Sequence, residues 1–127
     1  MIRWSMALLA GYLLAASPQL EQARDRQDRS ALEKIFAEKV SAAKKKPDDA
    51  AAQAELAEAA AYLAEVALEL QDRDRARSVA EAGIAAAQRA VALKPAVAEY
   101  HRLLGALCGQ AIPGNLLLAM RYGKCAA

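Results

Sequence analysis

Two prolines divide a chain that is otherwise patterned for α-helix. Pro47 and Pro95 each follow a long stretch in which apolar residues recur at helical spacing, and proline cannot continue a helix that reaches it. Alanine, the strongest helix former, makes up roughly a quarter of the residues. Runs of β-branched and aromatic residues bounded by turn signals, which mark strands, do not occur in the sequence. An all-α fold is therefore predicted, with helices packed closely through small side chains.

The ends of the expected helices carry start and stop signals. Ser30 and Glu33 have the spacing of a capping box, and the aspartates at 48–49 can cap the next helix. Gly109 and Asn115 are expected to end one helix and to begin the last. Helices are expected over residues 30–46, 50–71, 75–93, 98–108 and 116–127. Because no stop signal precedes the last residue, we expect an incomplete last hairpin or a native chain that continues.

The N-terminal segment differs in kind from the rest of the chain. Residues 1–3 are short and basic, and residues 4–16 are apolar and uncharged. This stretch is too short for a bilayer span of about 20 residues but suits the apolar region of a secretory signal. Residues 1–17 are therefore expected to be a signal peptide, with export to a periplasm; an uncleaved inner-membrane anchor is the alternative. Residues 18–29 alternate in charge and are expected to form a linker or a solvated helix with little core contact.

The charge of the chain gives no support for nucleic-acid binding. Lys and Arg number 17 and Asp and Glu 15, a net charge of +2, and the two signs are mixed along the expected helices. The densest basic run, residues 44–46, ends an expected helix, where cations interact favourably with the negative end of the helix dipole. No aromatic residues are interleaved with this run. We therefore expect it to stabilise a helix end rather than to bind phosphate.

Residues that could support catalysis or hold a metal occur singly. His101 has no Cys, Asp or Glu four residues further along, so we expect it to pack or to form a hydrogen bond. In an antiparallel hairpin Cys108 and Cys125 would lie roughly a dozen Å apart, so buried free thiols are favoured over a disulfide. No zinc, haem-attachment or phosphate-loop pattern occurs. We therefore expect neither a catalytic residue nor a metal nor a cofactor.

The junction at Pro95 resembles the junction between two tetratricopeptide (TPR) repeats. Ala90 lies five positions before Pro95, and the next helix carries a Leu-Gly pair at 104–105. TPR proteins place a small residue at the first of these positions and such a pair at the second. Small residues where two helices touch let their backbones approach. Ala42 lies five positions before Pro47 in the same way.

The resemblance is specific over residues 88–109 and elsewhere rests on the order and spacing of the helices. The two prolines lie 48 residues apart, whereas a TPR unit has about 34 residues, so elongated helices are expected. Ala87 and Lys39 stand where the family usually has a large aromatic residue. Long-helix relatives include the periplasmic helical component of TRAP transporters, which the chain resembles loosely.

A TPR-like chain implies a right-handed solenoid of antiparallel hairpins over residues 30–127, with a groove lined by the first helix of each hairpin. The groove-facing residues implied by the resemblance are Glu58, Tyr62, Glu99, Arg102 and Gln110. They offer charge, hydrogen bonds and an aromatic ring with a polar tip. The implied function is to bind a protein or peptide partner without catalysis. Because so few hairpins make a small groove, we also expect homo-oligomerisation or a C-terminal extension.

A membrane-anchored helical protein is the alternative from another class. Residues 4–16 would remain as an anchor, and residues 19–46 would act at the lipid surface or as part of a transporter accessory component. Acidic residues are mixed with basic ones in that region, which weakens attraction to anionic lipid. The partner-binding scaffold is therefore the favoured interpretation.

Overall fold

The computed structural model describes residues 18–112 and 116–126, and all the regular structure within them is α-helical. The helices are α1 (Pro18–Asp25), α2 (Arg29–Lys45), α3 (Ala50–Glu69), α4 (Arg73–Leu93), α5 (Ala98–Gln110) and α6 (Leu116–Ala126). The predicted all-α fold is confirmed over these residues. None of the described helices is long and apolar enough to cross a membrane. The signal or anchor expected at residues 1–17 and the cap expected at Asn115 lie outside the described residues.

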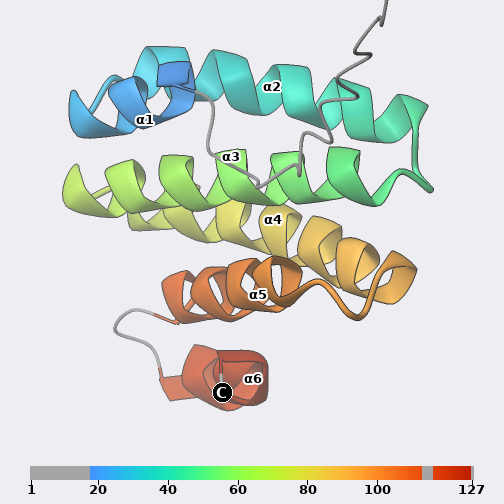
Figure 1. Cartoon of the computed structure of the whole chain (residues 1–127). Helices are drawn as coiled ribbons and strands as arrows, with labels where there is room; N and C mark the ends of the chain where they lie inside the picture. The colour runs from blue at the N-terminus through green and yellow to red at the C-terminus, as the bar shows by residue number, and fades with distance from the viewer. Residues whose placement is uncertain (1–17, 113–115, 127) are drawn as a thin grey trace, which may run out of the picture.

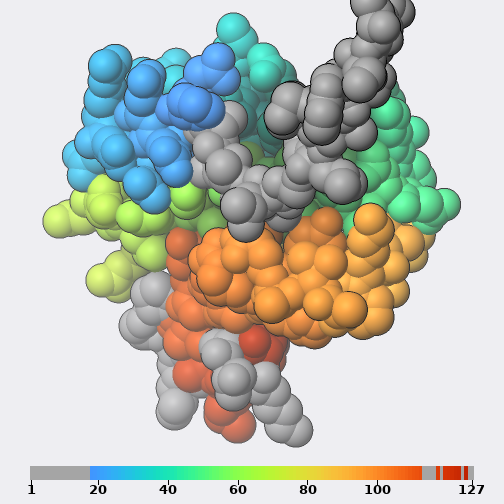
Figure 2. All heavy atoms as spheres, viewed as in Figure 1, coloured from blue at the N-terminus to red at the C-terminus, as the bar shows by residue number. Residues whose placement is uncertain are grey.

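The helices are stacked in the order of the chain. α3 lies at the centre and packs against α1 and α2 on one side and against α4 and α5 on the other (Figure 1). α5 also packs against α4, and α6 packs against α5. In the space-filling view α1 and α2 form one end of the molecule, α5 lies in the middle and α6 projects at the other end (Figure 2). The central helix α3 is therefore covered by helices from both the N-terminal and the C-terminal half of the chain.

Small side chains let α3 approach its neighbours closely. Most of the buried residues of α3 are alanines, and Leu63 and Val66 between them are fully buried. Gly83 of α4 marks the tightest approach, because a Cβ atom built there would lie 2.7 Å from Ala60 Cβ and 2.7 Å from Leu107 Cδ2. α3, α4 and α5 therefore meet at a point that leaves no room for a side chain on α4.

The turns that join α1 to α2 and α3 to α4 have the same structure. Each contains a glutamine in the left-handed conformation, Gln27 at φ 51° and Gln71 at φ 63°. The backbone N–H of the following aspartate, Asp28 or Asp72, donates to the carbonyl five residues earlier at 2.8 Å, which is a Schellman motif. Each aspartate side chain then caps the next helix. The sequence Gln-Asp-Arg occurs at both turns, so the two hairpins are joined alike.

The ends of α2 and α4 also match. Lys46 and Lys94 cap these helices, and their backbone N–H groups donate to the carbonyl oxygens of Ala42 and Ala90. A proline follows each lysine and prevents the helix from continuing. The chain therefore forms two successive hairpins, α1 with α2 and α3 with α4, whose turns are equivalent.

Replacing Gln71 with glycine is expected to raise the free energy of unfolding by about 0.5 kcal/mol, because glycine adopts the left-handed conformation without steric cost. Gln88→Gly is the matched control, since Gln88 is exposed in the interior of α4 and glycine should there lower the free energy of unfolding by about 0.5–1 kcal/mol. Urea unfolding of both variants measures the difference. Destabilisation of both variants by the same amount would contradict the helix-ending role of Gln71.

The capping box predicted at Ser30 and Glu33 is wrong. Asp28 is the N-cap of α2, and its carboxylate accepts a hydrogen bond from the backbone N–H of Ala31 at 3.1 Å. The helix therefore begins one residue before Ser30. Glu33 instead accepts two hydrogen bonds from Arg75 of α4, at 2.8 and 2.6 Å. The side chain that would close a capping box thus joins the first hairpin to the second.

Other helix ends agree with the sequence only in part. Asp49 caps α3, as predicted, by accepting from the N–H groups of Ala51 and Ala52. The basic residues 44–45 lie in the last turn of α2, which confirms that they stand at a helix end. Gly109 was expected to end a helix, and this is wrong, because α5 runs through it to Gln110. The helical backbone of α5 continues through Gly109, so this glycine does not adopt a helix-ending conformation.

The expectation that residues 18–29 make little core contact is also wrong. They form α1 and the turn after it, and α1 packs against α2 and α3. Leu20 and Ala23 are 4% and 5% exposed and belong to the main hydrophobic core. These two apolar residues lie three positions apart and place one side of α1 in the core, although most of its other residues are polar.

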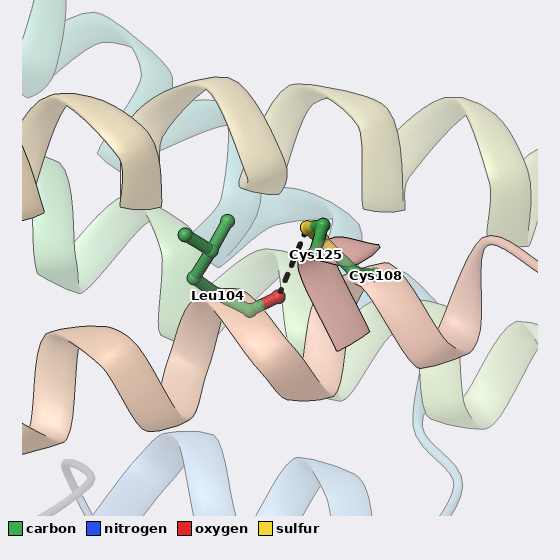
Figure 3. The surroundings of a disulfide bond; sticks show 3 residues. All are labelled: Leu104, Cys108 and Cys125. Carbon is green, nitrogen blue, oxygen red and sulfur yellow. Dashed lines mark hydrogen bonds between the residues drawn. A yellow bond between two sulfur atoms is a disulfide. The ribbon is translucent and has the colours of Figure 1, made fainter. Parts of the chain in front are cut away.

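Cys108 and Cys125 form a disulfide, so the expectation of free thiols is wrong (Figure 3). Their Cα atoms lie 5.7 Å apart, a normal separation for a disulfide. The expected distance assumed that the last two helices run antiparallel, whereas α6 crosses the direction of the other helices and is seen end-on in Figure 1. Because α6 crosses α5, Cys125 lies next to α5. Its Sγ also lies 3.9 Å from the carbonyl oxygen of Leu104.

Candidate partner-binding face

The five residues that the sequence singles out for partner binding are brought together by α3 and α5. Glu58 and Tyr62 lie one turn apart on α3, and the other three lie on α5, which packs against it. Electrostatic interactions connect Glu58 with Glu99 and Arg102, and Tyr62 with Arg102. Gln110 is joined to α3 directly, because its Nε2 donates to a backbone carbonyl of that helix at 2.9 Å.

α1 adds charged residues to the same face that sequence reasoning missed. The guanidinium carbon of Arg24 lies 4.7 Å from the ring centroid of Tyr62, a cation–π contact. Arg24 Nε also donates to a carboxylate oxygen of Asp25 at 3.0 Å. Glu21 acts electrostatically on Glu58, and Glu65 acts on Arg24. We call the following set the α1/α3/α5 face: Glu21, Arg24, Glu58, Tyr62, Glu65, Glu99, Arg102 and Gln110.

Glu58 is the most unusual member of the α1/α3/α5 face. It is 7% exposed, yet its carboxylate forms no hydrogen bond or ion pair with any residue that the structure describes. Burial raises the pKa of Glu58, and the negative charge of Glu99 raises it further, while Arg102 acts in the opposite direction. Buried carboxylates are normally paired or hydrogen-bonded, because the charged form loses its hydration. Glu58 is therefore a largely buried residue whose carboxylate has no ion-pair or hydrogen-bond partner among the described residues.

Glu99 and Arg102 form an ion pair one turn apart on α5. Arg102 Nε donates to Glu99 Oε2 at 2.7 Å, and the second guanidinium nitrogen bonds the other carboxylate oxygen. This hydrogen bonding lowers the pKa of Glu99. The side chain of Arg102 is 61% exposed, so the pair contributes little to stability. The ion pair with Glu99 also engages the guanidinium of Arg102, and Arg102 is the cation that acts most strongly on Glu58.

The side-chain amide of Gln110 donates one hydrogen bond and has an oxygen that could accept another. Its Nε2 donates to the carbonyl oxygen of Ala61, and its buried Oε1 has no hydrogen-bond partner in the described part of the chain. Tyr62 follows Ala61, and its pKa is raised by burial and by the charge of Glu58. The α1/α3/α5 face thus contains two side chains whose oxygens can accept further hydrogen bonds: the buried Gln110 Oε1 and the carboxylate of Glu58.

Replacing Glu58 with glutamine is expected to stabilise the protein at neutral pH by about 1 kcal/mol, because partial burial and the nearby charge of Glu99 both disfavour the charged carboxylate. Its pKa is raised in the folded state, so the folded state prefers the protonated carboxyl. The stability from this group is fully present below the unfolded pKa and is lost as pH rises through the folded pKa. The gain from Glu58→Gln should therefore disappear near pH 4.

Urea unfolding at about pH 4, 5.5 and 7 measures this difference, with Glu99→Gln as the control of opposite sign. The pKa of Glu99 is lowered, so its stabilisation is present above the unfolded pKa and is lost as pH falls through the folded pKa. Glu99→Gln should lower stability at neutral pH and have no effect in acid. A Glu58→Gln variant that is destabilised at pH 7 would contradict the unpartnered state of Glu58.

Other candidate residues do not assemble a site. His101 is exposed and its Nε2 lies 2.8 Å from the carbonyl oxygen of Pro95, which confirms the expected hydrogen bond. No group of three or more His, Cys, Asp and Glu side chains among the described residues is placed to hold a metal ion. A hollow between α4 and α6 is lined by Glu81 and Tyr122, which bond each other at 3.1 Å, and by the exposed Arg121. Its polar groups are thus paired or in contact with water.

Comparisons of the chain with family models, with curated proteins and with solved structures find no match. Function is therefore inferred from the geometry of the described residues.

Proposed function

We propose that this chain is an exported, TPR-like scaffold that binds a protein or peptide partner across the α1/α3/α5 face and catalyses no reaction. Glu58 supports this most directly, because it is a largely buried residue whose carboxylate has no partner among the described residues, and charged residues of both α1 and α5 act on it electrostatically. Burial of an unpaired charge opposes folding, and such groups gather at functional sites. Beside it Tyr62 offers a half-buried ring and Arg102 an exposed guanidinium, two residue types that are enriched where partners bind most strongly.

The repeated turns support the TPR-like part of the proposal. α1 with α2 and α3 with α4 are successive hairpins with equivalent turns, and α5 begins the next unit after the second proline. In such a series α1, α3 and α5 are the first helices, and contacts of α3 with both α1 and α5 place them in succession. The first helices line the binding groove in TPR proteins, so the α1/α3/α5 face is the corresponding surface here.

The Cys108–Cys125 disulfide supports export. Disulfides persist in oxidising compartments such as the periplasm and are rare in the cytosol. The apolar segment at residues 4–16 agrees with the same route. Both features are independent of the residues on the α1/α3/α5 face, so the binding proposal does not depend on them.

A library of random displayed peptides tests the binding proposal even though the natural partner is unidentified. The full chain, kept in solution with a mild non-ionic detergent, is the bait. We expect peptides that bind with micromolar affinity and whose affinity falls about tenfold or more in Tyr62→Ala and in the double variant Glu99→Ala/Arg102→Ala. Gln88→Ala is the control, because Gln88 is exposed on α4, outside the α1/α3/α5 face.

Two outcomes would overturn the proposal. One is a selection in which no peptide is enriched over the empty support. The other is a set of peptides that bind the Tyr62 and Arg102 variants as tightly as they bind the Gln88→Ala control. Circular dichroism of each variant confirms that the helices are intact before affinities are compared.

A further inference from the structure

We propose that the α1/α3/α5 face takes a cationic side chain of its partner, a lysine or arginine of a basic peptide segment, with the Glu58 carboxylate as its counter-ion. This inference rests on the proposed binding function and names the chemistry that the partner presents. It follows from the state of the cations on the α1/α3/α5 face, from the net charge of that face and from the contact in which the Tyr62 ring already holds the guanidinium of Arg24.

Both arginines of the α1/α3/α5 face are engaged by other residues, so neither forms an ion pair with Glu58 in the described part of the chain. Arg24 bonds Asp25 at 3.0 Å and lies over the Tyr62 ring. Arg102 bonds Glu99 through two of its nitrogens. Neither forms an ion pair with Glu58, although Glu58 is 7% exposed and Arg102 is near enough to act on it electrostatically. A carboxylate in this state can gain a charge-assisted hydrogen bond from a cation that a partner supplies.

The net charge of the α1/α3/α5 face has the sign that attracts such a cation. The face carries four carboxylates, at Glu21, Glu58, Glu65 and Glu99, and two guanidiniums, at Arg24 and Arg102, so its formal charge is −2 while the whole chain is +2. Glu21 from α1, Glu55 from α3 and Glu99 from α5 all act on Glu58, and Arg102 is the cation that opposes them. An approaching lysine or arginine therefore meets an attractive potential at Glu58, whereas an acidic segment would be repelled.

The contact between Arg24 and Tyr62 shows that this surface accommodates a cation over an aromatic ring. Arg24 belongs to α1, and it reaches across to the α3 ring at 4.7 Å. Tyr62 stands one turn from Glu58 on the same side of α3. A partner residue seated at Glu58 would therefore lie beside a ring whose polar hydroxyl and apolar body suit the long stem of lysine or arginine.

The test uses a peptide that has been selected for binding to the full chain. One change removes the cation of the peptide, and the other removes the carboxylate charge of the protein. Each lysine or arginine of the peptide is replaced in turn by norleucine or citrulline, which keep the length of the side chain and remove its charge. On the protein, Glu58→Gln removes the carboxylate charge. Glu38→Gln is the matched control, because it removes the same charge from an exposed position on α2, away from the α1/α3/α5 face.

We expect one peptide cation to be required, with affinity falling about tenfold or more on its neutralisation, and the same fall in Glu58→Gln. The two changes together should weaken binding no further than either alone, because they remove one contact. Glu38→Gln should bind as the wild type does. The carboxyl carbon resonance of Glu58 should report a lower pKa in the complex than in the free protein, which a purely structural role for Glu58 would not produce.

The inference fails if Glu58→Gln binds the selected peptides as tightly as the wild type, or if those peptides share no cation. In either case loss of binding in Tyr62→Ala would still uphold the proposed function. If no peptide binds at all, or if binding ignores Tyr62 and Arg102, the proposed function fails and the cation inference falls with it. Equal losses in Glu38→Gln and Glu58→Gln would show non-specific attraction of basic peptides and would also overturn the inference.

Discussion

The Gly83→Ala variant is expected to lose about 3 kcal/mol of unfolding free energy, the upper end of the usual cost of overpacking a core. The new Cβ would lie 2.7 Å from both Ala60 Cβ and Leu107 Cδ2. Ala60 Cβ cannot move without its helix backbone, and Leu107 is fully buried and has little room to rotate. The clash must therefore separate α3, α4 and α5 at the centre of the stack.

Gly109→Ala is the matched control for this prediction. Gly109 lies within α5, and a Cβ atom there would have nothing within 4 Å. Alanine is the better helix former, so this variant should gain about 0.5–1 kcal/mol. Urea unfolding of the two variants side by side measures the contrast. If Gly83→Ala proved as stable as Gly109→Ala, the close approach of the three helices would be wrong.

Reduction of the Cys108–Cys125 disulfide is expected to weaken the docking of α6 on α5 by about 3 kcal/mol, the value for a closed loop of this size with 17 residues of separation. α6 is also joined to α4 by the hydrogen bond from Tyr122 Oη to Glu81 at 3.1 Å. Amide hydrogen exchange with and without reductant measures the effect. Protection should fall in α6 and persist in α2, α3 and α4.

Cys125→Ser provides the control for the reductant itself. Without reductant this variant should show the same loss of protection in α6 as the reduced wild type, and reductant should change it no further. Equal protection of α6 in the oxidised and reduced wild type would contradict the role of the disulfide. General loss of protection in all helices would instead show that α6 supports the whole stack.

The positions of the longer helices could be predicted from sequence because prolines and apolar spacing set them. The stops at Pro47 and Pro95 hold, and Asp49 caps α3 as its position predicts. The capping box at Ser30 failed because an aspartate two residues earlier is the better cap, and it is placed by the left-handed Gln27 before it. Local sequence patterns thus predicted where the longer helices lie. The exact ends of the helices depended on the geometry of the turns, and a glutamine in the sequence does not indicate a left-handed turn residue.

The candidate site could be predicted only where it lies on the long helices. Glu58 lies on α3 and Glu99 on α5, which packs against α3, and the two carboxylates interact electrostatically. Arg24 was missed because residues 18–29 were expected to be a linker or a solvated helix with little core contact, and only Leu20 and Ala23 mark the buried side of α1. The disulfide was missed for a different reason: the angle at which α6 crosses α5 is set by tertiary packing, and no short sequence pattern encodes it.

The most direct test of partner binding is to map the contact on the protein by NMR. A selected peptide is added to the isotope-labelled full chain, and backbone amide shifts are followed through the titration. The largest changes are predicted along α1, α3 and α5, near Arg24, Tyr62 and Arg102. Largest changes in the hollow between α4 and α6, near Glu81, or in no region at all, would contradict the assignment of the α1/α3/α5 face as the partner-binding surface.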